Sequence, residues 1–213
     1  MENDCAFCNR INFEERLIAE NSACYAVAAL GQITGGHVFI IPKMHVPCMG
    51  ALAPHHSFRQ MEEIRKMTEK AYHALKKEYP HGNRMVLSPV IMFEDTITEQ
   101  RMPHANLHII PIAVDLTKKI RADFPKAEIK ELKDTPDLQK IYRDDPKPYL
   151  FWTTPDGHPM MCIDPVAPPH YLHIITAKLL GYPERADLRT MNRTLDRALW
   201  EKTVSSLKLH LTE

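Results

Sequence analysis

The sequence predicts an α+β protein in which a β-sheet packs against one long helix. Short runs rich in β-forming residues span 22–30, 36–42, 85–93 and 101–111, bounded by turns, prolines or a polar loop. A long amphipathic segment, residues 54–79, separates the second run from the third. The order strand, strand, helix, strand, strand favours an antiparallel or mixed sheet covered by that helix.

The long helix has a start signal, an apolar stripe and a stop signal. Ser57 is a suitable N-cap, and residues 80–83 end the helical pattern. The face opposite the stripe is charged, as expected for a helix that covers a sheet. The apolar stripe consists of Phe58, Met61, Ile64, Ala71 and Leu75.

The second half of the chain has a different character. Residues 118–143 are highly charged, with a weak helical signal at 127–133, and we interpret them as a solvated connecting segment. A hairpin is expected over 148–165, with its turn at 154–157, followed by helices at 174–180 and 193–211. Tyr149, Phe151 and Trp152 are expected in the hairpin core rather than as base-stacking platforms. The resulting division is a domain over 1–117, a connecting segment over 118–146 and a C-terminal region over 147–213.

Composition excludes some classes of protein. The 27 basic and 27 acidic residues give zero net charge, so no global field attracts nucleic acid or an anionic membrane, although a local basic patch is compatible with this balance. No apolar run reaches the roughly 20 residues of a membrane span. The acidic N-terminus does not resemble a signal or transit peptide. Five cysteines, an odd number, favour a reducing compartment, the cytosol or the nucleus.

Three polar residues form a row in the run 101–111. His104, Asn106 and His108 alternate with apolar residues, so on a strand they share one face at intervals of roughly 7 Å. Such a row could be a metal site, a phosphate site or a hydrogen-bonded structural cluster. Lys43 and Arg101 flank it and are candidate phosphate contacts, although a lone basic residue is more often solvated.

Other residues could hold a metal. Cys5 and Cys8 form a Cys-x-x-Cys pair, which can bind one metal ion through both sulfurs, or be a redox pair or two buried small side chains. His45 follows the strand that ends at Pro42, a position where functional residues are common. We assign His37 and the pair at 55–56 to the surface.

Together, Cys5-x-x-Cys8, the segment Gly36 to His45 and the segment His104 to Pro111 resemble the histidine-triad (HIT) superfamily. The resemblance implies a central antiparallel sheet. It also implies a structural Zn²⁺ bound by Cys5, Cys8, His45 and His104.

The same resemblance implies a missing nucleophile. HIT enzymes carry the nucleophilic histidine at the position of Asn106, and a carboxamide cannot form the phosphoramidate intermediate. The acidic residue that active members offer to the ribose is replaced by apolar residues at 28–30. Their Ser-containing approach to the triad is replaced by residues 99–103. We therefore expect no catalytic residue at this site.

The segment His104-Ala105-Asn106-Leu107 is similar to the CwfJ family, a branch of the superfamily associated with splicing complexes and lariat-RNA turnover. The segments 148–157 and 181–189 are similar to that family's C-terminal region. His108 departs from the pattern, because many members carry glutamine there. The resemblance implies a zinc-stapled, mainly non-catalytic protein. It would bind RNA, including branched intron RNA, and splicing or debranching proteins. The expected location is the nucleus, and the cytoplasm is a further option. The RNA contacts would be Lys43, Arg101, Asn106 and His108. A nucleotide hydrolase or nucleotidyl transferase with an atypical site and a protein-protein adaptor are the alternatives, and a homodimer is left open.

Overall fold

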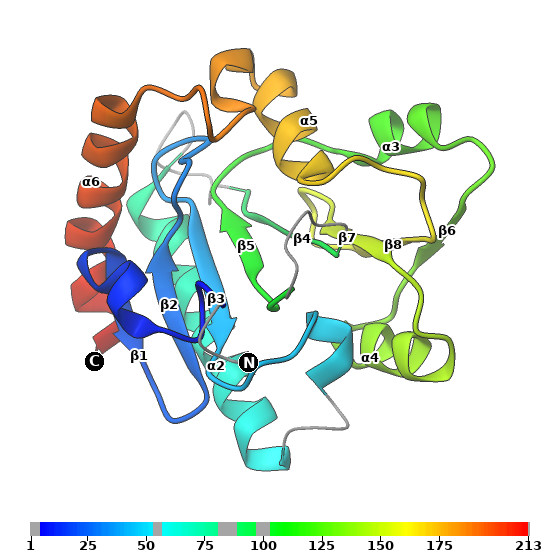
Figure 1. Ribbon diagram of the computed structural model, residues 1–213, viewed down its shortest axis with the longest axis horizontal. Helices are drawn as coiled ribbons and strands as arrows, with labels where there is room; N and C mark the ends of the chain where they lie inside the picture. Colours follow the sequence, from blue (N-terminus) through cyan, green and yellow to red (C-terminus); the bar gives the residue numbers. More distant parts are fainter. Residues whose placement is uncertain (1–4, 53–56, 81–88, 97–102, 213) are drawn as a thin grey trace.

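The computed structural model describes residues 5–52, 57–80, 89–96 and 103–212. Within them, eight strands form one sheet in the order β1-β2-β3-β5-β4-β7-β8-β6, and all neighbouring pairs are antiparallel (Figure 1). This confirms the α+β class and the antiparallel sheet. The strands are β1 (Leu17–Glu20), β2 (Cys24–Ala28), β3 (Val38–Pro42), β4 (Ile91–Asp95), β5 (Leu107–Ile110), β6 (Glu128–Glu131), β7 (Tyr149–Thr153) and β8 (Pro159–Ile163).

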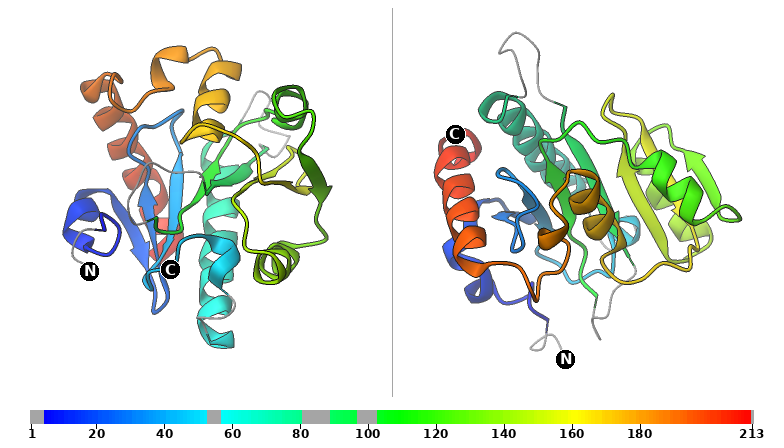
Figure 2. Two further views of the ribbon diagram at one scale, coloured as in Figure 1. Left: turned by 45° about the vertical axis from the view of Figure 1, so that its right-hand side comes forward. Right: turned by 90° about the horizontal axis from the view of Figure 1, so that it is seen from above.

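Helices cover the sheet on both faces. The described α-helices are α2 (Phe58–Glu78), α3 (Thr117–Asp123), α4 (Thr135–Asp144), α5 (Tyr171–Leu179) and α6 (Arg193–Thr212), and the described 3-10 segments are η2 (Arg10–Arg16), η3 (Met49–Ala51) and η4 (Pro183–Arg185). α2 and α6 lie side by side behind β1, β2 and β3, whereas α5 lies on the other face (Figures 1 and 2). Among the described residues, no helix combines the length and hydrophobicity that a membrane crossing needs.

Alternate residues of the segment 104–109 point to opposite faces of the sheet. Ala105, Leu107 and Ile109 are buried in the core beneath α2 and α6. A second core lies where α3 and α5 cover β4, β7 and β8, and it includes the fully buried Trp152. Because successive residues of a strand point to opposite faces, His104, Asn106 and His108 lie on the face away from α2.

The long helix begins as the sequence predicts. The Ser57 side chain accepts from the Gln60 backbone N–H, and the Gln60 side chain reaches back to the Ser57 backbone N–H, which completes a capping box. Ile64, Ala71 and Leu75 are buried, as expected. Phe58 is 87% exposed, so its assignment to the apolar stripe is wrong. It is the first residue of the helix, one position after the cap.

The hairpin is confirmed and extends the same sheet. β7 pairs with β4, and Tyr149, Phe151 and Trp152 are all buried, so their assignment to the core is confirmed. The helical signal at 127–133 is wrong, because Glu128–Glu131 pair with β8 as an edge strand. The charged segment also contains α3 and α4. The division into domains stays a prediction.

Candidate metal centre and adjoining pocket

Four side chains expected to bind a metal come together at one edge of the sheet. Cys5 and Cys8 lie in the turn that precedes η2, His45 follows β3, and His104 leads into β5. One potential ligand atom from each lies within 4.8 Å of the others. The Cys8 N–H donates to the Cys5 carbonyl at 3.2 Å, so this turn holds both sulfurs on the same side.

The distances fit tetrahedral coordination. His104 Nδ1 lies 3.3 Å from Cys5 Sγ and 3.5 Å from Cys8 Sγ, and His45 Nδ1 lies 3.3 Å from Cys8 Sγ. A metal with bonds of about 2.3 Å to sulfur and about 2.0 Å to nitrogen places such pairs about 3.5 Å apart at the tetrahedral angle. The four residues could therefore hold one metal ion without a rearrangement of the backbone.

The protein fixes the orientation of the His104 ring. Its Nε2 lies 2.9 Å from the Pro42 carbonyl oxygen, which can only accept, so Nε2 carries the hydrogen and Nδ1 keeps its lone pair for a metal. Burial lowers the pKa of His104, which favours the neutral ring that a metal requires. The Ala105 N–H donates to the Val46 carbonyl at 2.8 Å and joins the two histidine-bearing segments.

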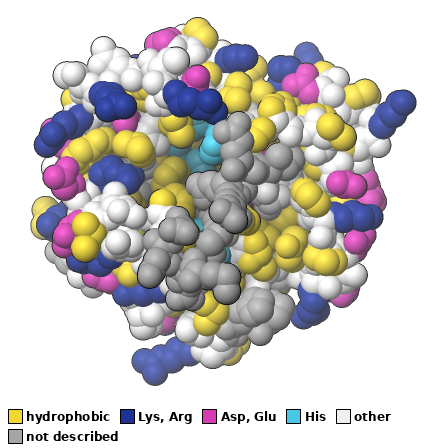
Figure 3. Space-filling model, viewed as in Figure 1, with side chains coloured by type: hydrophobic (Ala, Val, Ile, Leu, Met, Phe, Trp, Pro, Cys, Tyr) yellow, Lys and Arg dark blue, Asp and Glu magenta, His cyan; other side chains and the backbone are white. Residues whose placement is uncertain are grey.

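A pocket of about 310 Å³ adjoins this centre. The row residues His104, Asn106 and His108 form part of its wall, on the sheet face that α2 leaves open. On the face seen in Figure 1, histidine side chains reach the surface next to hydrophobic and Lys or Arg side chains (Figure 3). The other lining residues include Phe7, Phe13, Arg16, Leu30, Phe39, Glu94, Asp95, Thr96, His170, His173 and Leu188.

One contact of Asn106 determines which nitrogen atoms of Asn106 and His108 carry hydrogen. Asn106 Nδ2 lies 2.9 Å from the His104 carbonyl oxygen, so the amide nitrogen must face that acceptor and Oδ1 faces His108 Nε2 at 3.1 Å. His108 Nε2 therefore carries the hydrogen, and its Nδ1 accepts from His37 Nε2 at 3.0 Å. Burial is the main cause that lowers the pKa of both His37 and His108 well below the usual value, so both rings are neutral at pH 7.

His37 corrects one sequence prediction. It is 0% exposed, so its assignment to the surface is wrong. It precedes β3, and its ring lies 5.0 Å from the His108 ring and 6.0 Å from the His173 ring, centroid to centroid. The pair at 55–56 lies outside the described residues.

The candidate RNA contacts occupy different environments. Asn106 and His108 line the pocket, whereas Lys43 is not among the lining residues. The Lys43 Nζ lies 2.7 Å from a Glu20 carboxylate oxygen and 4.8 Å from the centroid of the Tyr25 ring. Arg101 lies outside the described residues.

Sequence reasoning missed most of the polar lining residues, among them Arg16, His170 and His173. Arg16 donates to the Ala28 carbonyl at 2.9 Å from the end of η2, and burial is the main cause that lowers its pKa. His170 and His173 come from the start of α5, which belongs to the C-terminal half of the chain. No motif in the sequence connects them to the row.

Glu94 is the buried acid of this pocket. It is 2% exposed, and it accepts from the Met49 N–H at 2.9 Å and from the Tyr149 hydroxyl. Burial raises its pKa to about 7, more than the hydrogen bonds lower it.

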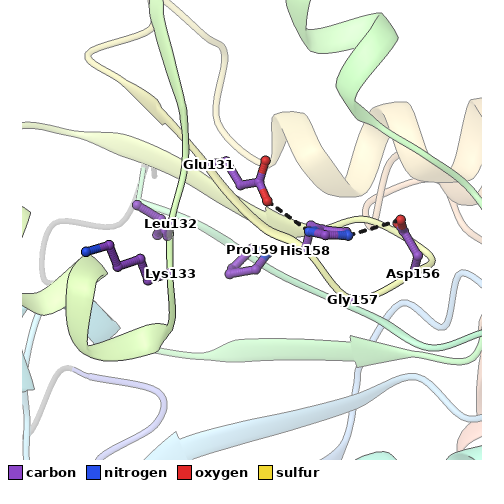
Figure 4. A pocket seen from close by; sticks show the side chains of 7 residues that line it. All are labelled: Glu131, Leu132, Lys133, Asp156, Gly157, His158 and Pro159. Atoms are coloured by element: carbon purple, nitrogen blue, oxygen red, sulfur yellow. Dashed lines mark hydrogen bonds and ion pairs between the residues drawn. The ribbon is translucent and has the colours of Figure 1, made fainter.

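A second, larger cavity of about 470 Å³ lies at the edge formed by β6 and the β7–β8 turn (Figure 4). There the His158 ring lies between Glu131 and Asp156, at 2.8 Å and 3.3 Å. All three side chains are more than half exposed. Solvated charges of this kind bind weakly, so we place the functional site at the histidine pocket instead.

Comparison with known proteins agrees with the motifs. A family model described as "Protein similar to CwfJ C-terminal" matches residues 1–125, which is more than half of the chain. The chain belongs to this family. The match ends at residue 125, so the resemblance of the second half to CwfJ proteins stays a prediction. No curated protein matches the sequence.

Several solved structures are similar in part. A hypothetical protein from Leishmania major is 22% identical, with a TM-score of 0.39 over 54% of this chain and 77% of its own. A hypothetical histidine triad nucleotide-binding protein from Sulfolobus tokodaii is 22% identical, with a TM-score of 0.38 over 66% and 90%. A Hit-like protein involved in cell-cycle regulation from Bartonella henselae is 18% identical, with a TM-score of 0.36 over 63% and 86%.

Proposed function

We propose that this CwfJ-family chain is a non-catalytic RNA-binding protein that acts in pre-mRNA splicing or intron-lariat turnover. One observation carries the proposal: the pocket is open to a ligand, but Asn106, at the nucleophile position, has both ends of its amide engaged by neighbours. A site that keeps its cavity without a nucleophile binds rather than reacts.

The metal in this proposal is a structural Zn²⁺. Two thiolates and two imidazoles form a closed tetrahedral donor set, which is typical of zinc and leaves no position for a substrate. When bound, Zn²⁺ would cross-link three chain segments and would take no part in a reaction. Cys5, Cys8, His45 and His104 would hold it.

The hydrolase alternative requires His108 to replace the lost nucleophile. Both ring nitrogens of His108 already take part in hydrogen bonds, at 3.0 Å to His37 and 3.1 Å to Asn106. Its lowered pKa also makes the ring a weaker base at neutral pH. These contacts favour a binding role.

RNA affinity needs a local source, because the net charge is zero. Among the described lining residues, Arg16 is the one Lys or Arg side chain, and the half-buried Phe7 lines the same pocket. Arginine with aromatic rings is a common combination in sites that bind single-stranded RNA. A nuclear location and contact with splicing or lariat-debranching proteins belong to the same proposal.

The first test is affinity purification of the tagged protein from its own cells at low salt, with the co-purifying proteins and RNA both identified. Late spliceosomal proteins, debranching enzyme or branched intron RNA are the expected result. Recovery of proteins without RNA would favour an adaptor and contradict the RNA-binding role.

A second test separates binding from catalysis. The purified protein is incubated with adenosine-phosphate esters and dinucleoside polyphosphates, and we expect no turnover. Turnover that is lost in His108→Ala would contradict the proposal and favour the hydrolase. Turnover that appears only in Asn106→His would support a site that lost its nucleophile.

A further inference from the structure

His173 brings the C-terminal half of the chain into the pocket. It lies in the first turn of α5, is 5% exposed and lines the cavity together with Asn106 and His108. It also lies outside residues 1–125, the segment that the family model matches. The pocket wall at this point is therefore a property of this chain that the family match does not describe.

One contact fixes the chemistry of the His173 ring. Its Nε2 lies 3.0 Å from the Arg185 carbonyl oxygen, and because a carbonyl only accepts, Nε2 carries the hydrogen. Burial lowers the pKa of His173 to about 4, so the ring is neutral at pH 7. In a neutral imidazole the other nitrogen, Nδ1, is then an acceptor with a free lone pair.

Nδ1 of His173 has no hydrogen-bond partner among the described residues. His173 is one of the residues that line the cavity, and its side-chain hydrogen bond within the described part of the chain is the one that Nε2 makes. A ligand in the pocket can thus donate a hydrogen bond to Nδ1.

The acceptor restricts which part of a ligand can bind there. The phosphodiester oxygens of RNA carry no hydrogen at pH 7 and cannot donate to Nδ1. In RNA the available donors are the ribose 2′-hydroxyl and the amino or imino groups of the bases, and DNA lacks the first of these. The half-buried Phe7 lines the same pocket and can stack on any base without reading its edge, so we assign the hydrogen bond to the sugar.

Resting on the proposed function, we infer that His173 Nδ1 accepts a hydrogen bond from a ribose 2′-hydroxyl of bound RNA and makes the pocket select RNA over DNA. His173 is then a specificity-determining residue. Its partner Arg185 is a positioning residue, because its carbonyl fixes the ring hydrogen on Nε2.

The test measures binding of a short single-stranded oligouridine and of the matching oligodeoxyuridine, which differ only in the 2′-hydroxyls. For the unaltered protein we expect tighter binding of the RNA by roughly threefold to tenfold, the effect of one neutral hydrogen bond. Equal affinity for both oligomers would overturn the inference and leave the proposed function standing. Binding of neither oligomer would overturn both.

Two variants separate recognition from damage to the fold. His173→Phe removes the acceptor, and His173→Gln retains a donor for the Arg185 carbonyl while its own acceptor, Oε1, is displaced from the position of Nδ1. In both we expect the RNA-to-DNA ratio to fall close to one while affinity for the DNA stays unchanged. An equal loss of affinity for both oligomers would indicate a structural role of His173 and overturn the inference.

The matched control is His158→Phe, which changes an exposed histidine at the β7–β8 turn and should leave the ratio unchanged. A base series completes the test, with adenine and cytosine oligomers in ribose and deoxyribose forms. We expect the same ribose preference for every base. A preference that follows the base instead of the sugar would overturn the inference.

Discussion

Asn106 shows how a single residue can be both structural and part of a ligand site. Its amide donates to the His104 carbonyl and accepts from His108, so it connects a candidate metal ligand to the buried histidine pair. The same side chain lines the pocket. The three interpretations of the row therefore do not compete: His104 belongs to the metal cluster, and Asn106 and His108 form a hydrogen-bonded cluster that is also the pocket wall.

Replacement of Asn106 tests this network. In Asn106→Ala, the His108 Nε2–H loses its acceptor in a buried site, and we expect the free energy of unfolding to fall by about 1–3 kcal/mol. The measurement is chemical denaturation with metal bound. The matched control is Asn12→Ala, because Asn12 makes an exposed hydrogen bond to the Ala6 carbonyl, and its loss should cost about 0.5 kcal/mol or less. Equal losses in the two variants would contradict the network.

Glu94 predicts a pH dependence of stability. Its pKa rises from the ordinary value of 4.5 to about 7 in the folded protein, so between these values the folded state binds more protons than the unfolded state. Stability contributed by this group is thus present below pH 4.5 and is lost as the pH rises to about 7. The loss approaches about 3 kcal/mol for a shift of this size.

The comparison with Glu94→Gln isolates the contribution of Glu94 to the pH dependence of the free energy of unfolding. Release of metal at low pH, which acts in the opposite direction, is common to both proteins and cancels in the difference. We expect the free energy of unfolding of Glu94→Gln, relative to the unaltered protein, to increase between pH 4.5 and pH 7. A difference that does not change with pH would show that Glu94 titrates normally.

The candidate metal ligands were predictable from sequence, whereas much of the pocket was not. The resemblance to HIT proteins implies the set Cys5, Cys8, His45 and His104, because each of these residues lies in a short local motif that the resemblance rests on. His173 has no such pattern, since only packing of α5 against the sheet brings it beside the row. His37 was misassigned because a histidine is usually exposed, and its hydrogen bond to His108 depends on the pairing of β3 with β5.

At the scale of elements, periodicity was informative where one face is buried and one exposed. α2 has this pattern and was predicted with its cap. β6 was not, because three of its four residues are exposed and charged, and what holds it in place is backbone pairing with β8. β1 was also missed, as a strand of four residues beside a 3-10 segment gives little signal.

The cap of α2 can be tested separately. Ser57→Ala removes the acceptor for the Gln60 N–H, and we expect a loss of about 1 kcal/mol in the free energy of unfolding. Ser205→Ala is the matched control within α6, where the hydroxyl donates to the Lys202 carbonyl at an exposed position. Urea denaturation of both variants gives the comparison. A loss in Ser205→Ala as large as that in Ser57→Ala would argue against a specific effect of the cap.

At the scale of the whole molecule, the C-terminal half is fastened to the N-terminal half at several points. Asp196 on α6 is buried, and its carboxylate accepts from the backbone N–H groups of Gly31 and Gln32 at 3.2 Å and 2.7 Å. β7 continues the sheet beside β4, and the start of α5 contributes His170 and His173 to the pocket wall. These contacts connect the row, the pocket and the chain's last helix in one hydrogen-bonded body.

The metal cluster is a further cross-link of this body, and its removal should affect the whole molecule. Bound metal would join the turn at Cys5 and Cys8 to the end of β3 and the start of β5. A ligand that binds only the folded state at 1,000 times its Kd stabilises by about 4 kcal/mol, so a strong chelator should lower Tm markedly. Metal analysis before chelation should find about one zinc per chain, and a finding of none would contradict the zinc site.

Two variants show whether the chelator acts through this cluster. Cys8→Ser lacks one ligand, so its Tm should be low from the start and should change little on chelation. Cys24→Ser is the control, because Cys24 is a buried cysteine of β2 outside the cluster, and the Tm of this variant should still fall when the chelator is added.

Hydrogen exchange should show where the loss of structure begins on metal removal. We expect the first amides to lose protection in residues 5–16, because this segment reaches the sheet edge through Cys5 and Cys8. Since Phe7, Phe13 and Arg16 line the pocket, that loss should also weaken ligand binding, and unchanged binding by the metal-free protein would separate the metal from the pocket.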